Sequence, residues 1–159
     1  NLSSGNRWLM NIYIQKEDFD ISSLIQELKK KSNSVGAIAS FIGLMRDIND
    51  GKTIQSMTLE HYPEMTKKTL EDICIKAKEK WKIIDLVVAH RYGTININDN
   101  IVFVGVASQH RKDAFAACEF IMDFLKTNAT FWKKEYHVDG KSSWVDSRKS
   151  DDDALNRWQ

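Results

Sequence analysis

The stretch IVFVGVASQHRKDAFAACEFIMDFLK, residues 101–126, holds two strong secondary-structure signals, one directly after the other. Residues 101–108 form a short apolar run, which predicts a buried strand. Residues 112–126 place apolar side chains at helical spacing, which predicts an amphipathic helix; these are Ala114, Ala117, Cys118, Ile121, Met122 and Leu125. The segment therefore predicts a sheet with at least one helix packed against it.

The rest of the chain mixes strand and helix signals without strict βαβ alternation. Helices are expected to start near Asp20 or Ser22, which are candidate N-caps, and at Pro63, which suits a first helical turn. A turn at Asp50-Gly51 is expected to pair the strand after it with the preceding strand, 36–43. Further strands are expected at 10–15, 53–62, 83–91, 131–136 and 142–147. These elements predict an α+β fold with a mixed, mainly antiparallel sheet and packed helices.

Length and composition indicate an ordinary globular domain. The chain has 159 residues, 42% hydrophobic and 28% charged, with a net charge of +1. This balance gives no global field for nucleic acid or a membrane, and no apolar run approaches the ~20 residues that span a bilayer. We expect an N-terminal extension or added remnant without a secretory signal at 1–9, one domain at 10–150 and a charged tail at 151–159.

Two cysteines, Cys74 and Cys118, each fall at an apolar position of a helical pattern. They give neither zinc-binding spacing nor a disulfide framework, so a reduced, cytoplasmic setting is expected. The chain also lacks a P-loop, GxGxxG, HExxH and GxSxG. His61 and His90 lie near strand ends without metal-like grouping, and we interpret them as structural.

The stretch LKTNATFWKKE, residues 125–135, sets three lysines around the apolar pair Phe131-Trp132. Successive strand residues face opposite sides, so Lys133 and Lys134 cannot both enter one pocket. Lys126 lies just past the apolar stripe of its helix. There it either complements the helix dipole or forms part of a site. A lysine crowded by other cations can act as a nucleophile or proton carrier, and the residues alone leave both interpretations open.

Other cations also follow predicted strands. His110-Arg111 stands between a buried strand and a helix start, where backbone N–H groups favour an anion, although a loop facing water is an equal alternative. Arg46 follows the strand at 36–43, and Arg148 follows the last strand. An arginine beside Asp47 before a turn is commonplace, so Arg46 is the weaker candidate on spacing alone.

Several segments together resemble the large, catalytic subunit of molybdopterin synthase, the MoaE family. In chain order they are GAIASFIGLMRDINDGK (36–52), LEHYPEM (59–65), AHRYGTININD (89–99), VGVASQHRKDAFAACEFIMDFLK (104–126) and FWKKE (131–135). The resemblance implies an α/β-hammerhead-type fold and a sulfurtransferase that needs neither metal nor cofactor. It also implies a substrate, cyclic pyranopterin monophosphate, which gains two sulfurs as the dithiolene of molybdopterin in molybdenum cofactor biosynthesis.

The resemblance also implies partners. Sulfur arrives on a small ubiquitin-like subunit whose C-terminal Gly-Gly ends in a thiocarboxylate. Two large subunits form a central homodimer of a heterotetramer. The competing hypothesis is a non-catalytic module that binds a phosphorylated small molecule or a ubiquitin-like tail.

Site residues follow from the same resemblance. Lys126 and Lys133 match the two active-site lysines, and Lys126 is expected nearest the carrier's terminal glycine, where it either becomes acylated or only orients the tail. Thr130 stands where the family usually has proline, which loosens the loop between the lysines. The substrate-binding set that the resemblance implies is Arg46, His110, Arg111, Arg148, Phe41 and Met122.

Overall fold

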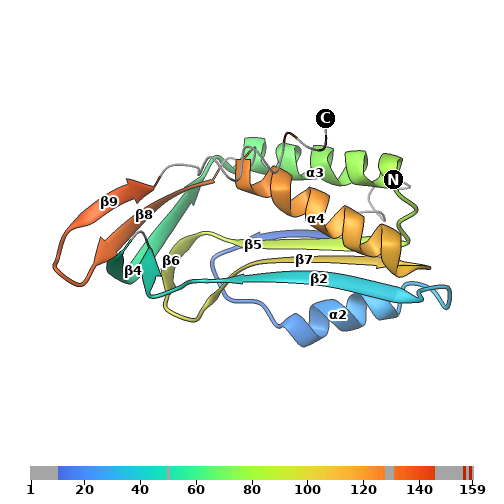
Figure 1. Ribbon diagram of the computed structural model, residues 1–159, viewed down its shortest axis with the longest axis horizontal. Coiled ribbons are helices and arrows are strands. Elements are labelled where there is room, and N and C mark those ends of the chain that lie inside the picture. Colours follow the sequence, from blue (N-terminus) through green and yellow to red (C-terminus); the bar gives the residue numbers. More distant parts are fainter. Residues whose placement is uncertain (1–10, 50, 128–130, 146–155, 157, 159) are drawn as a thin grey trace.

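The computed structural model describes residues 11–49, 51–127, 131–145, 156 and 158. Its helices and strands alternate irregularly along the chain (Figure 1). In chain order they are β1 (Asn11–Gln15), α2 (Ile21–Lys29), β2 (Ala37–Leu44), β3 (Ile48–Asn49), β4 (Lys52–His61), α3 (Pro63–Lys80), β5 (Asp85–Arg91), β6 (Gly93–Asn96), β7 (Asn100–Ser108), α4 (Arg111–Thr127), β8 (Phe131–His137) and β9 (Ser142–Val145).

A four-stranded sheet in the order β1-β5-β7-β2 forms the centre of the fold. The β1–β5 pair is parallel, whereas β5–β7 and β7–β2 are antiparallel. Helices α3 and α4 cover one face of this sheet, and α2 covers the other (Figure 1). The predicted α+β class with a mixed, mainly antiparallel sheet and packed helices is therefore confirmed.

Strand β5 shows why the predicted apolar runs are continuous rather than alternating. Leu86 and Val88 belong to the core under α3 and α4, whereas Val87 and Ala89 belong to the core under α2. All four are 0% exposed. A strand covered on both faces can be apolar at every position, because neither face meets water.

Local sequence signals set the helix ends. The Asp20 carboxylate caps α2 by accepting hydrogen bonds from the backbone N–H groups of Ser22 (3.0 Å) and Ser23 (3.4 Å). Pro63 opens α3, where its missing N–H has no helical partner to lose. The buried stripe of α4 ends at Leu125, so Lys126 lies in the last turn, as expected.

A second sheet contains β3, β4, β6, β8 and β9. It shows that the predicted pairing of the strand at 53–62 with the strand at 36–43 is wrong. Strand β4 pairs with β3, β6 and β8, and not with the strand at 36–43, which is β2 and pairs with β7. The turn before Lys52 is real, and Gly51 adopts a φ of 77°, but this turn joins the two-residue strand β3 to β4. A register shift after Ile54 also breaks the simple alternation along β4, so that Met57 and Leu59 are the next buried residues.

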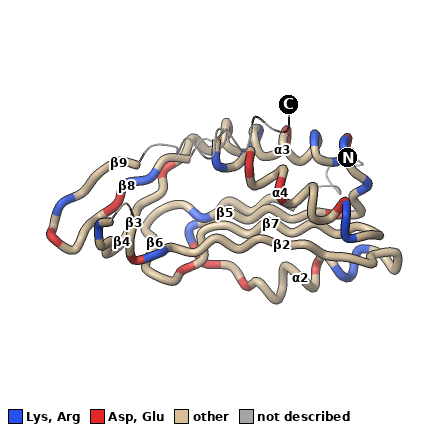
Figure 2. Tube along the Cα trace, viewed as in Figure 1, with Lys and Arg blue, Asp and Glu red and all other residues tan. Residues whose placement is uncertain are grey.

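Charged residues lie mainly outside the central strands. Strands β2 and β7 carry none, while cations and anions are interspersed over the helices and the second sheet (Figure 2). Within the described residues, no helix combines the length and apolarity needed to cross a membrane.

The burial pattern predicts that replacing two phenylalanines by alanine changes the stability of the fold to different extents. Phe103 is 0% exposed under α2, so Phe103→Ala should lower the free energy of unfolding by about 3–5 kcal/mol. Phe115 is 64% exposed on α4, so Phe115→Ala should change it by less than about 0.5 kcal/mol. Urea denaturation of both variants measures the difference. Similar losses for both variants would contradict this burial pattern.

Candidate active site

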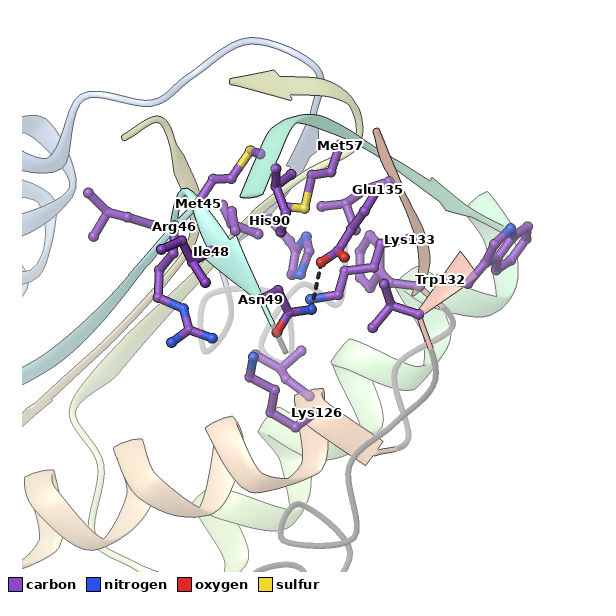
Figure 3. A pocket seen from close by; sticks show the side chains of 17 residues that line it. Met45, Arg46, Ile48, Asn49, Met57, His90, Lys126, Trp132, Lys133 and Glu135 are labelled. Atoms are coloured by element: carbon purple, nitrogen blue, oxygen red, sulfur yellow. Dashed lines mark hydrogen bonds between the residues drawn. The ribbon is translucent and has the colours of Figure 1, made fainter. Parts of the chain in front are cut away.

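A cavity of about 380 Å³ opens where the C-terminal end of α4 meets the second sheet (Figure 3). Three cations from separate elements line it: Arg46 after β2, Lys126 at the end of α4 and Lys133 in β8. Its other lining residues include the apolar side chains of Met45, Ile48, Met57 and Leu125. The arrangement combines an apolar wall with converging positive charge.

A second cavity of about 390 Å³ shares residues with the first. Arg46, His90 and Lys126 line both cavities. Phe41 and Met122 line only the second one. The structure therefore brings together five of the predicted site residues, namely Arg46, Lys126, Lys133, Phe41 and Met122.

His110 and Arg111 lie elsewhere in the chain's own fold. Arg111 is the first residue of α4, and Lys126 is fifteen residues further along the same helix. At 1.5 Å per residue, this separation is about 22 Å. His110 and Arg111 are exposed, and neither lines the two cavities. The expectation that they share one cleft with the lysines is wrong for a single chain. Arg148 and Thr130 lie outside the described residues.

Strand β8 separates its two lysines as the alternation predicts. Phe131, Lys133 and Glu135 line the first cavity from one face. Lys134 lies on the other face, with its ammonium 5.7 Å from the ring centre of Tyr136 and 5.5 Å from that of Trp144. Lys134 is half-buried against these rings rather than fully solvated. Lys133 is thus the β8 lysine of the site.

The ring of Phe131 stacks on two imidazole rings. Its ring lies 3.7 Å from the ring centre of His90 at an interplanar angle of 14°, and 5.6 Å from that of His61 at 24°. Beside it, Trp132 packs on Tyr62 with ring centres 4.8 Å apart, and its indole points away from the cavity (Figure 3). These contacts anchor the start of β8.

The strand-end position of His90 predicts a structural role, but in the structure His90 also lines both cavities. Its side chain is 9% exposed, and its Nδ1 lies 2.8 Å from the Arg91 carbonyl oxygen. Burial, with a smaller contribution from the positive charge of Lys126, lowers the pKa of His90 to about 4. The ring is therefore neutral near pH 7. The only sequence signal was its position at the end of a strand.

Glu135 and Asn49 are two further residues that sequence analysis did not assign. Glu135 is 4% exposed, and its Oε2 accepts a hydrogen bond of 2.7 Å from Asn49 Nδ2. A buried carboxylate is costly unless it is paired or hydrogen-bonded, so this bond and the nearby cations make its burial tolerable. Its shared face with Lys133 was the available signal. Among the described residues, no three His, Cys, Asp or Glu side chains group as a metal ion would require.

The fold and the cavity define an α+β protein with a cation-lined pocket suited to anionic groups. A family model described as "MoaE protein" matches residues 14–128, and the chain belongs to this family. A molybdopterin synthase catalytic subunit from Ralstonia nicotianae is 52% identical over 92% of this chain and 83% of its own length.

Solved structures are similar as well. The molybdopterin biosynthesis MoaE protein from Burkholderia ambifaria has a TM-score of 0.81 at 46% identity, covering 94% of this chain and 98% of that one. Molybdopterin synthase from Staphylococcus aureus has a TM-score of 0.78 at 30% identity, covering 84% and 96%.

The lowered pKa of His90 predicts that acid destabilises the fold. Between pH 6.5, its ordinary pKa, and about 4, the unfolded chain binds a proton that the folded chain does not. The stability from this group is fully present above pH 6.5 and is lost as the pH falls toward 4. The shift corresponds to about 3 kcal/mol.

Urea denaturation near pH 7 and near pH 4 measures this loss in the wild type and in His90→Phe, which keeps a ring against Phe131. The variant should lose less stability on acidification, because its ring cannot take up a proton. The lowered pKa of His61 acts in the same direction in both proteins. Equal losses in the two proteins would contradict the assignment to His90.

Proposed function

We propose that this chain is the catalytic subunit of a molybdopterin synthase and works in the cytoplasm. It transfers sulfur from the thiocarboxylated C-terminus of a small ubiquitin-like subunit to cyclic pyranopterin monophosphate. The observation that carries the proposal is the convergence of Lys126 and Lys133, from α4 and β8, on one cavity of a MoaE-family chain.

The charges in the cavity suit both reactants. A cyclic phosphate and a chain terminus are both anions, and Arg46, Lys126 and Lys133 present only hydrogen-bond donors. Sulfur addition expels oxygen from the pterin side chain, and the departing oxygen requires a proton. Lys126 and Lys133 are the proposed proton donors and stabilise the negative charge that develops.

Exposed apolar residues around the cavities suit the extended tail of the carrier subunit. Leu44 is 49% exposed and Ile48 is 50% exposed, and both line the first cavity. Phe41, 41% exposed, lines the second. These apolar side chains would contact the tail, and the terminal group of the tail would reach the lysines. Lys126, shared by both cavities, is the proposed contact of the terminal glycine.

His110 and Arg111 are proposed to act from a second copy of the chain. They are exposed and lie about 22 Å along α4 from Lys126, so one copy cannot bring them to its own lysines. In a homodimer, the N-terminal end of α4 of one copy would approach the cavity of the other. Arg111 would then add a fourth cation to the substrate pocket.

A non-catalytic module that binds a phosphorylated molecule is the alternative function, and the lysine pair separates it from the enzyme. Lys126→Ala and Lys133→Ala should each lower turnover of the cyclic pterin by about 10²–10⁴-fold, since each removes a proposed proton donor. Formation of dithiolene product with thiocarboxylated carrier measures the effect.

Lys134→Ala is the matched control, because Lys134 lies on the opposite face of β8. It should keep turnover within about twofold of the wild type. Intact turnover in both cavity variants would exclude the catalytic assignment. Equal losses of binding and turnover would favour the module.

Mixing of two variant subunits tests whether Arg111 acts from a second copy of the chain. Lys126→Ala and Arg111→Ala should each be weakly active alone, because every pocket then lacks one group. When the two variants are mixed and allowed to exchange subunits, each mixed dimer regains one complete pocket. Random pairing restores about a quarter of wild-type turnover. If mixing restores nothing although mixed dimers form, Arg111 does not act across the dimer.

A further inference from the structure

We propose that His90 is a binding residue of the candidate site, whose Nε2 accepts a hydrogen bond from a neutral N–H or O–H group of a bound reactant. The inference deepens the proposed function and rests on it, because it assigns a task in the same pair of cavities. The donor is either a backbone amide of the carrier's C-terminal glycines or an amine or hydroxyl of the pterin.

The tautomer of His90 follows from its backbone contact. A carbonyl oxygen can only accept, so the 2.8 Å contact with Arg91 requires that Nδ1 carries the hydrogen. In a neutral imidazole, the other nitrogen then has a free lone pair. The Arg91 contact therefore makes Nε2 an acceptor.

That acceptor borders the cavities. His90 is one of six residues that line both of them, and Arg46 and Lys126 are the two charged residues among the six. Within the described part of the chain, His90 Nε2 makes no hydrogen bond, and it is not among the nitrogens sealed from solvent without a partner. His61 differs here, since its Nδ1 is sealed and unpaired. A histidine that is 91% buried thus keeps an unused acceptor at the junction of two cavities.

The ring cannot easily turn away. His90 lies in β5 between β1 and β7, opposite Ile14 and Val102, and its ring stacks on Phe131 at 3.7 Å. The following residue is also anchored, because the Arg91 Nε donates to the Lys16 carbonyl oxygen at 2.9 Å. A fixed acceptor loses little freedom when a reactant binds.

The acceptor complements the other polar groups of the cavities. Arg46, Lys126 and Lys133 can only donate, and Glu135 Oε2 is occupied by Asn49. A reactant that places its anionic end on the cations still carries neutral donors, which lose water when they enter. His90 receives one of them without adding charge, because burial and the facing cation Lys126 keep the ring unprotonated.

Nitrogen-15 NMR of histidine-labelled protein tests the contact directly. The resonance of His90 Nε2, identified by its absence in His90→Phe, should lie where unprotonated imidazole nitrogens appear. It should shift upfield when a donor binds. Carrier ending in an ordinary carboxylate and cyclic pyranopterin monophosphate are added separately. The addition that shifts the resonance identifies the source of the donor, and the inference is overturned if neither does so at saturation.

Kinetics of two variants separate hydrogen bonding from packing. His90→Phe keeps a ring on Phe131 and lacks the acceptor, whereas His90→Gln lacks the ring and keeps an acceptor near the Nε2 position. We expect His90→Phe to raise KM for the reactant identified by NMR about tenfold. His90→Gln should raise this KM much less, because it keeps an acceptor. The opposite order would show a packing role and overturn the inference.

His61→Phe is the control, because His61 also stacks on Phe131 but does not line the cavities. It should leave KM within about twofold of the wild type. Binding shifts are measured without turnover. A wild-type protein that shifts but forms no dithiolene would refute the proposed function alone, and an active enzyme whose resonance never moves would refute the role of His90 alone.

Discussion

The stacking of Phe131 on both His90 and His61 joins the two sheets where the candidate site forms. His90 is the penultimate residue of β5 in the central sheet, His61 ends β4 of the second sheet, and Phe131 begins β8. Because strand residues alternate in direction, fixing Phe131 also fixes the facing of Lys133 and Glu135. The packed stripe of α4 brings Lys126 to the same place from the other side. The meeting of the two lysines therefore depends on apolar and aromatic packing rather than on attraction between charges.

Electrostatics then limits which neighbours these lysines can have. Like charges in a partly buried cavity repel, and the buried Glu135 offsets part of this repulsion while Asn49 satisfies one of its oxygens. His90 stays neutral, since a positive charge on this buried ring, close to the cation Lys126, would be unfavourable. The cavity remains positive enough for an anion and still contains a neutral acceptor. The same burial that excludes the proton from His90 thereby makes its lone pair available.

Features that depend on residues close together in the sequence could be predicted from it, whereas features that depend on distant segments could not. Patterns within one element were sufficient for the stripe of α4, the Asp20 cap and the separation of Lys133 from Lys134, because each depends on residues a few positions apart. Strand partners depend on distant segments, so the pairing of β4 with β3, β6 and β8 was missed. Burial between the two sheets placed His90 and Glu135 at the candidate site. Their local signals, a strand end for His90 and a face shared with Lys133 for Glu135, were too weak to assign them. Arg46, Lys126, Lys133, Phe41 and Met122 were found through the family resemblance, with spacing adding the choice of Lys133.

Helix α4 was the element most strongly predicted, and it also separates the predicted site into two parts. Its fifteen-residue span holds His110-Arg111 and Lys126 about 22 Å apart. The packing that places Lys126 at the cavity therefore keeps His110 and Arg111 away from it. The ends of the helix differ electrostatically as well. Its N-terminus carries partial positive charge beside Arg111, whereas its C-terminus carries partial negative charge beside Lys126. A pocket built from opposite ends of two copies of this helix would combine an anion-attracting end with a stabilised ammonium, which a single copy cannot provide. The geometry of one helix thus gives a physical reason for the proposal that the site is shared between subunits.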